Sequence, residues 1–140
     1  MKSWADLSLG NGAGFRDAYR TLSLYNTSSA KVEALPSKNL YRLYVCGITP
    51  YDATHLGHAA TYVTFDLINR YLRFGGAQVS FVQNITDIDD PLLERANRDK
   101  VDWSALADSQ INLFKSDMSA LRIIPPEHFI KVTESLTIIE

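Results

Sequence analysis

The strongest constraint on the fold of this chain is the segment 40–58, where an apolar strand pattern passes through a polar loop into a helical pattern. Residues Leu40 to Cys46 are rich in Tyr, Leu and Val, which favour a pleated, buried strand. The strand pattern stops at Gly47, where the missing side chain lets another backbone or a ligand come close. A helical pattern opens near His55, so the segment predicts the start of a βαβ unit, in which ligands bind outside the carboxyl ends of the strands.

The residues that follow predict the rest of this unit. From His55 to Phe74, apolar residues recur at spacings of three and four, with Thr54 as the expected N-cap and Gly75-Gly76 as the expected end. Residues Ala77 to Gln83 have the pattern of a second strand. Strand, helix and strand in this order predict a right-handed parallel crossover, which places the carboxyl ends of both strands side by side. Those ends are residues 46–49 and 84–87.

Two helices are predicted after the second strand. The first runs from Pro91 to about Arg98, with Asp90 as its acidic N-cap. Asp102 is expected to cap the second, which carries an apolar stripe of the kind that packs in a core. The stripe consists of Trp103, Leu106, Ala107, Ile111, Phe114, Met118 and Leu121. Pro125-Pro126 breaks the chain, and Thr133 is expected to cap a last helix that the remaining residues are too few to stabilise.

The segment before residue 40 predicts little regular structure. Residues 1–20 show no clear period, and Gly10, Gly12 and Gly14 predict a flexible loop, because no strand precedes them and the lysine of a phosphate-binding loop is missing. Thr21 to Tyr25 is a candidate short strand, followed by a turn at Asn26 to Ser29.

Composition narrows the class of protein. The 140 residues are 46% apolar and 21% charged, which is ordinary for one soluble globular domain. A net charge of -2 gives no basic surface for nucleic acid. The single cysteine excludes an internal disulfide, and no apolar run has the length of a signal peptide core or a membrane span. These features predict a cytoplasmic protein that binds neither nucleic acid nor membrane.

Two histidines suggest the chemistry. His55 and His58 lie on one face of a helix's first turn, where free N–H groups and the helix dipole already favour an anion. Two imidazoles there suit a phosphate group, above all the charge that develops on ATP during adenylate formation. For an arbitrary pair at this spacing, capping or core histidines are the commoner explanation. Gly57 between them favours the phosphate site, because glycine is tolerated in a helix where something must approach closely.

These residues also carry a family resemblance. HLGH at 55–58 resembles the HIGH signature of class I aminoacyl-tRNA synthetases, and YVCGITPYD (44–52) and VQNITDIDD (82–90) resemble the cysteine-activating branch. The resemblance runs from about Leu40 to the last residue. It implies an α/β fold with a Rossmann-like parallel sheet of the class I synthetase (HUP) type, incomplete in this chain. Residues 1–39 would then be an N-terminal extension, and 40–140 the first half of the catalytic domain.

The resemblance also implies roles for particular residues. His55 and His58 would be catalytic and hold the ATP phosphates, while Gly57 would leave room for adenine. The residues implied to bind ATP and cysteinyl-adenylate are Cys46, Gly47, Ile48, Thr49, Gly57, Thr61, Asn84, Ile85 and Thr86. Without the resemblance, Thr61, Thr64 and Thr86 would be read as ordinary polar positions of a helix face or strand end.

The resemblance gives Cys46 a second role, as the first ligand of a zinc ion that binds the thiolate of substrate cysteine. Zinc prefers thiolate to hydroxyl and so separates cysteine from serine. The other ligands would come from later in the protein, so the zinc site is expected to be incomplete in this chain. A lone cysteine at a strand end is otherwise a small buried apolar residue.

The acidic run after the second strand has two interpretations. Asp87, Asp89 and Asp90 could form a divalent metal cluster, but they lack the spacing of an EF-hand. We therefore predict that Asp90 caps a helix and that the other two carboxylates orient the loop.

Four departures from cysteinyl-tRNA synthetases bear on the substrate: Pro50, Ala53-Thr54, Ala60 and Pro91. Each resembles instead the ligase family that joins cysteine to glucosaminyl-inositol in mycothiol biosynthesis. Two of them remove positive charge, which suits an amino-sugar acceptor better than a polyanionic RNA. The resemblance thus implies L-cysteine, glucosaminyl-inositol and ATP with Mg²⁺ as substrates of a monomeric ligase. The alternatives are a fragment of a cysteinyl-tRNA synthetase or a non-catalytic nucleotide-binding α/β module.

Overall fold

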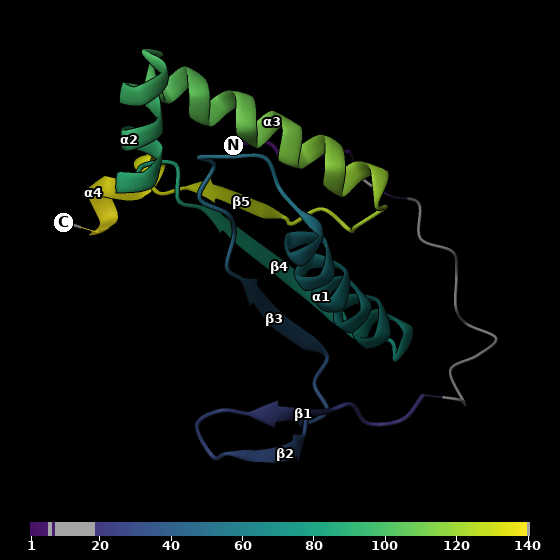
Figure 1. Cartoon of the computed structure of the whole chain (residues 1–140). Helices are drawn as coiled ribbons and strands as arrows, with labels where there is room; N and C mark the ends of the chain where they lie inside the picture. The colour runs from purple at the N-terminus through teal and green to yellow at the C-terminus, as the bar shows by residue number, and fades with distance from the viewer. Residues whose placement is uncertain (6, 8–18, 140) are drawn as a thin grey trace.

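The computed structural model describes residues 1–5, 7 and 19–139. Its centre is a parallel sheet with the strand order β3-β4-β5, in which β4 pairs with both neighbours (Figure 1). The strands span Leu40–Val45 (β3), Gln78–Ile85 (β4) and His128–Lys131 (β5). The predicted parallel pairing of the first two strands is therefore confirmed.

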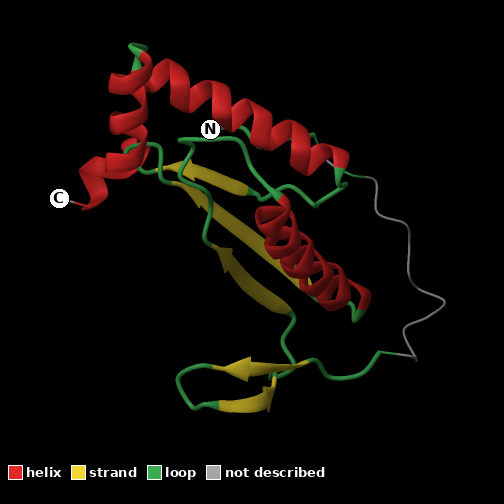
Figure 2. Ribbon diagram, in the orientation of Figure 1, coloured by secondary structure: helices red, strands yellow, loops and turns green. Residues whose placement is uncertain are grey.

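Three helices connect these strands. Helix α1 (Leu56–Phe74) links β3 to β4, while α2 (Asp90–Asp99) and α3 (Trp103–Ala120) link β4 to β5 (Figure 2). All three match the predicted helices within one or two residues, apart from their caps. Helices α1 and α3 each turn an apolar face towards the core beside the sheet, whereas α2 packs against α3.

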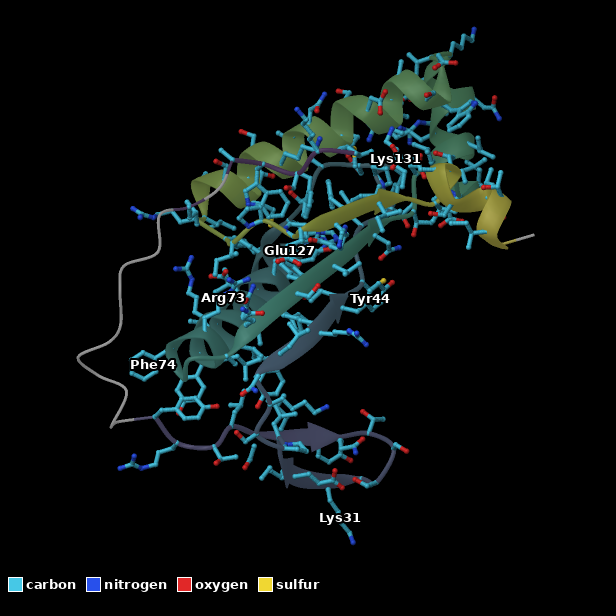
Figure 3. The ribbon with its side chains drawn as sticks, turned by 180° about the vertical axis from the view of Figure 1, so that it is seen from behind. Lys31, Tyr44, Arg73, Phe74, Glu127 and Lys131 are labelled. Atoms are coloured by element: carbon cyan, nitrogen blue, oxygen red, sulfur yellow. The ribbon has the colours of Figure 1, made fainter. Side chains whose placement is uncertain are left out.

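The core lies between one face of the sheet and helices α1 and α3. Val45, Phe81 and Phe129 contribute from the three strands, and Tyr62 of α1 meets Phe114 of α3 with ring centroids 5.1 Å apart. The predicted stripe of α3 faces this core through its buried members Ala107, Ile111, Phe114 and Met118. The opposite face of the sheet exposes Leu40, Tyr44 and Ile130. Of these three residues, Tyr44 is labelled in Figure 3.

Two of the three caps predicted for these helices are wrong. Helix α1 is capped by His55 and not by Thr54, whose hydroxyl donates instead to Asp117 of α3. Helix α2 is capped by Asp89, which accepts from the backbone N–H of Asp90, so Asp90 is the first helical residue. Asp102 caps α3 as predicted, accepting from the N–H of Ala105.

The segment after α3 holds a strand that the sequence does not reveal. Strand β5 is only four residues long, and its partner β4 decides its conformation. A 3₁₀ turn, η2 (Thr133–Ser135), and a short helix, α4 (Leu136–Ile139), follow. The prediction that Thr133 caps this helix is wrong, because its hydroxyl and its N–H both donate to Asp87 beyond the end of β4, at 2.5 and 3.0 Å. Asp87 thus orients a loop, as predicted.

A separate hairpin precedes the sheet. Strand β1 (Ser23–Asn26) confirms the predicted short strand with shifted bounds, and it pairs antiparallel with an unpredicted strand, β2 (Lys31–Ala34). The Asn26 side chain accepts from the N–H of Ser28, which stabilises the predicted turn. The predicted glycine loop at Gly10, Gly12 and Gly14 lies outside the described residues.

Within the part of the chain that the structure describes, no helix has both the length and the apolar character that a membrane crossing requires.

Candidate functional site

The carboxyl ends of β3 and β4 lie side by side, as the sequence predicts. The N–H of Gly47 donates to Oδ1 of Asn84 at 2.9 Å, and the N–H of Thr86 donates to the carbonyl of Ile48 at 3.0 Å. A Cβ atom on Gly47 would lie 1.6 Å from the carbonyl oxygen of Asn84. Gly47 is therefore required for the close approach of the two chains, and the neighbour that it admits is backbone.

A cavity of about 270 Å³ lies between this strand end and the start of α1. Five of the predicted site residues line it: Gly47, Ile48, Thr49, His55 and His58. The other residues that line the cavity were not among the predicted site residues: Tyr51, Asp52, Ala53 and Thr54. Their position in the loop that joins β3 to α1 was the one available signal, because a loop at a carboxyl strand end lines the crevice in this type of fold.

The two histidines cap the helix that they begin. Nδ1 of His55 accepts from the N–H of Gly57 at 3.1 Å, and Nδ1 of His58 accepts from the N–H of His55 at 3.2 Å. The two rings lie 4.2 Å apart between centroids, tilted by 41°. This reciprocal arrangement is a capping box, and it satisfies two N–H groups that a helix start otherwise leaves free.

The capping bonds determine which tautomer each neutral imidazole adopts. A nitrogen that accepts a hydrogen bond carries no proton, so each neutral ring bears its proton on Nε2. Neither Nε2 has a hydrogen-bond partner among the described residues. Partial burial and the nearby His55 lower the pKa of His58 below its ordinary value, which favours the neutral form. The pair thus offers two N–H donors beside the cavity.

Gly57 gives the His55 ring its space. A Cβ atom on Gly57 would lie 2.8 Å from Cε1 and 3.0 Å from Nδ1 of His55. In this conformation the imidazole occupies the room that the missing side chain leaves. Adenine would have to approach Gly57 from another side or displace that ring, so its predicted role towards adenine stays a prediction.

Comparisons with known proteins identify the family to which this site belongs. A model of the family described as tRNA synthetases class I (C) catalytic domain matches residues 32–140. The chain belongs to this family. Its fold is similar to that of Mycobacterium tuberculosis methionyl-tRNA synthetase in complex with methionyl-adenylate, with a TM-score of 0.63 and 28% sequence identity over 69% of this chain and 19% of that one. The predicted class I synthetase fold is confirmed.

Curated relatives are more similar in sequence. The L-cysteine:1D-myo-inositol 2-amino-2-deoxy-alpha-D-glucopyranoside ligase of Nocardia farcinica is 53% identical over 97% of this chain and 32% of its own length. The ligase of the same name from Gordonia bronchialis is 54% identical over the same shares. The chain thus spans about a third of the length of the curated relatives it matches.

In this class I catalytic domain, Cys46 lies at the end of β3 with an exposed side chain. It is therefore not the buried apolar residue that a lone cysteine usually is. Its carbonyl accepts from the hydroxyl of Tyr62 at 3.4 Å, and burial raises the pKa of that phenol to about 12. Among the described residues, no group of three or more His, Cys, Asp or Glu side chains is placed to hold a metal ion.

The remaining predicted residues do not line the cavity. The Thr61 hydroxyl donates to the carbonyl of Gly57 within its own helix, at 3.1 Å. Oδ1 of Asn84 is engaged by Gly47 and by the hydroxyl of Tyr44. The Ile85 side chain is completely buried, so only its backbone could face a ligand.

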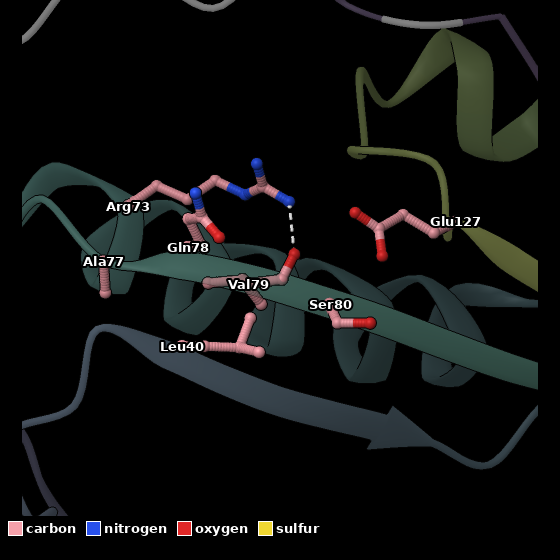
Figure 4. Close-up of a pocket in the computed structure, with 7 residues that line it drawn as sticks. All are labelled: Leu40, Arg73, Ala77, Gln78, Val79, Ser80 and Glu127. Atoms are coloured by element: carbon pink, nitrogen blue, oxygen red, sulfur yellow. Dashed lines mark hydrogen bonds between the residues drawn. The ribbon is translucent and has the colours of Figure 1, made fainter.

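A second cavity, of about 490 Å³, lies at the other end of the strands in this catalytic domain (Figure 4). Its lining residues are Leu40, Arg73, Ala77, Gln78, Val79, Ser80 and Glu127. Nη2 of Arg73 donates a hydrogen bond to the carbonyl oxygen of Val79 at 2.8 Å. None of the predicted site residues lines this cavity. The smaller cavity at the carboxyl ends is therefore the candidate active site.

Proposed function

We propose that the protein carrying this chain activates L-cysteine with ATP to cysteinyl-AMP and joins the cysteinyl group to the amine of glucosaminyl-inositol. The observation that carries this proposal is the similarity to eight relatives whose name gives L-cysteine and 1D-myo-inositol 2-amino-2-deoxy-alpha-D-glucopyranoside as the substrates of a ligase, at 50–58% identity over 82–99% of the chain. Because the chain spans about a third of such relatives, the activity is proposed for the whole protein.

In the first step, the carboxylate of cysteine attacks the α-phosphorus of ATP, bound with Mg²⁺, and pyrophosphate leaves. We assign the two free Nε2–H groups of His55 and His58 to the ATP phosphates, because they are donors that need not break the capping bonds. The amino end of α1 adds the partial positive charge of the helix dipole at the same place. Donors held in place before the reaction stabilise charge that develops in the transition state.

In the second step, the amine of the sugar attacks the activated carbonyl, and AMP leaves with the electron pair of the broken C–O bond. We assign binding of the adenylate to Gly47, Ile48 and Thr49 in the cavity, to Gly57 and Thr61 on α1, and to Asn84, Ile85 and Thr86 at the carboxyl end of β4. The side chain of Asn84 and the backbone N–H of Thr86 are hydrogen-bonded to Gly47 and Ile48, two residues that line the cavity. Binding energy there would align the reacting atoms.

Cys46 is proposed as one zinc ligand that would help to select cysteine over serine. Its exposure at the strand end is compatible with that role, and a bound zinc would hold the substrate as a thiolate. The described residues supply one such thiolate and no group of three ligands, so they do not form a zinc site by themselves. The other ligands would have to come from elsewhere in the protein.

We further propose that residues 40–140 form the first half of the catalytic domain and that residues 1–39 extend it. The whole protein is proposed to act as a cytoplasmic monomer on small molecules, without nucleic acid or membrane. The net charge of -2 favours this over RNA binding, which usually requires a basic surface.

Cysteine-dependent exchange of pyrophosphate with ATP, measured on the complete gene product, tests the first step. We expect exchange with cysteine and at least about 100-fold less with serine, as expected of a site that needs a group the analogue lacks. Absence of exchange would favour a non-catalytic nucleotide-binding module. Analysis of the product then distinguishes two enzymes that both activate cysteine. A cysteinyl amide of glucosaminyl-inositol supports the proposal, whereas cysteinyl-tRNA would indicate a cysteinyl-tRNA synthetase.

A further inference from the structure

The loop between β3 and α1 forms most of the wall of the candidate active site, yet it contains neither helix nor strand between residues 46 and 55. Within the loop, the N–H of Tyr51 donates to the carbonyl of Thr49, and the N–H of Ala53 donates to the Asp52 side chain. These short-range bonds shape a turn but do not fix its position relative to the two histidines. Contacts from outside the loop must do that.

Arg95 of α2 supplies the first such contact. Its Nη1 donates both to the carbonyl oxygen of Tyr51 and to Oδ1 of Asp52, the latter at 3.0 Å, from 43 positions further along the chain. Its Nε donates to Asp99 one turn further along the same helix, at 3.3 Å. The Arg95 side chain is only 24% exposed, whereas that of Asp52 is 67% exposed. The guanidinium is therefore held by its own helix while it holds the loop.

Helix α3 supplies a second contact close to the first histidine. The hydroxyl of Thr54 donates to Oδ2 of Asp117 at 2.6 Å, 63 positions away. Thr54 directly precedes the helix cap His55, so this bond restrains the point where the loop enters α1. The helix pair that follows β4 thus touches the loop at its turn and at its end.

We propose that Arg95 is a positioning residue of the candidate active site, which acts by holding the Tyr51–Asp52 turn against α2. This inference rests on the proposed function, because it concerns the wall of the cavity in which ATP and cysteine would react. Arg95 does not line the cavity and is not assigned to the chemistry. A fixed wall keeps the reacting groups aligned, and a displacement of about 1 Å in such a wall can reduce the rate by about 100-fold.

The helix offers a matched control in Arg98. Arg98 lies one turn from Arg95 and donates to the same partner, Asp99, but its hydrogen bonds do not reach the loop. Its side chain is 71% exposed. Arg98→Ala therefore removes the same charge from the same helix, together with its electrostatic attraction to Asp52, but it removes no hydrogen bond to the loop.

The test measures pyrophosphate exchange and thermal unfolding for the complete gene product and for Arg95→Ala, Arg95→Lys and Arg98→Ala. We expect Arg95→Ala to lower kcat by about 10- to 100-fold. The Michaelis constants and the unfolding midpoint should change little. Arg95→Lys should recover part of kcat, because an ammonium group can donate to the turn without the fork of a guanidinium. Arg98→Ala should stay within about twofold of wild type, since surface ion pairs contribute little.

Amide hydrogen exchange over residues 48–54, measured without substrates, decides the structural half of the inference. Faster exchange in Arg95→Ala than in Arg98→Ala is expected. Equal rates of amide hydrogen exchange in the loop and equal kcat in the two variants would overturn the positioning role, even if the wild-type protein is active. A wild-type protein without pyrophosphate exchange would instead refute the proposed function and, with it, a positioning role in that reaction. Amide hydrogen exchange in the loop would then still show whether Arg95 anchors the turn.

Discussion

Replacing His55 by Asn and His58 by Gln should separate the capping role of the two histidines from their proposed chemical role. Asn is among the best N-cap residues, and Gln at the third helical position can complete a capping box. His55→Asn and His58→Gln therefore keep side-chain acceptors for the two N–H groups that Nδ1 now caps. Both variants lack the Nε2–H that we assign to ATP. The alanine variants at the same positions lose the cap and the donor together.

The two roles predict effects of different kind and size. Loss of an N-cap acceptor destabilises a protein by about 1 kcal/mol, so each alanine variant should unfold about 2–8 °C earlier, and the cap-preserving variants should stay near wild type. Loss of a donor to developing charge lowers kcat by about 100- to 1,000-fold, or about 2.7–4 kcal/mol of barrier. That loss should appear equally in His55→Asn and His55→Ala, because both lack the imidazole. The affinity for cysteine should change little.

Thermal unfolding and cysteine-dependent pyrophosphate exchange, measured on the same preparations of the complete gene product, distinguish the two roles. Low kcat with a wild-type unfolding midpoint in His55→Asn and His58→Gln supports the phosphate role. Exchange within a few-fold of wild type in those variants, with losses only where the cap is lost, would refute it. The histidines would then be structural caps, the commoner role for a pair at this spacing.

Three further predictions follow from single contacts. Gly47→Ala should destabilise the fold by about 3 kcal/mol or more, because the new Cβ would overlap the Asn84 carbonyl, and a urea unfolding midpoint near wild type would contradict this. Cys46→Ser in the complete gene product should lose bound zinc and cysteine activation together, and full zinc content by elemental analysis would remove Cys46 from the ligand set. The lowered pKa of His58 means that its protonation opposes folding, so the stability it contributes is present above its ordinary pKa of 6.5 and is lost as the pH falls below that value. The unfolding midpoint should therefore fall between pH 7.5 and 5.5, and less so in His58→Gln.

The sequence predicts the βαβ unit well because its signals are local and redundant. The strand 40–45 is dense in apolar and aromatic residues, the helix 56–74 has a clear period, and Gly47 and Gly75 mark where those patterns stop. Parallel pairing follows from that order, since a strand, helix and strand in succession have few other ways to pack. The strand ends and the cavity between them follow from the pairing.

The errors arise where a residue's role depends on partners distant in sequence. Thr54 has the usual chemistry of an N-cap, but Asp117 takes its hydroxyl and the chain turns into the helix one residue later. Thr133 likewise donates to Asp87, whose position is set by the end of β4. Strand β5 has no period of its own, because in four residues only the partner strand can determine its conformation. No local sequence pattern predicts the contact between Arg95 and the loop, because its partners lie more than 40 positions away in sequence.

The capping box also constrains how this site would meet ATP. Each Nδ1 is committed to a backbone N–H, so adding a proton there would break a cap at the start of α1 as well as place charge beside the other ring. Each neutral ring is therefore a directed N–H donor, and the lowered pKa of His58 favours this neutral form at that position. Attraction of the phosphates would then rest on the helix dipole and on short hydrogen bonds, both of which act only at close range. ATP affinity should accordingly depend weakly on ionic strength and, near pH 7, weakly on pH. A steep rise in affinity as the pH falls from 7.5 to 6 would show that charged histidines bind the phosphates, and the assignment of their capping nitrogens would be wrong.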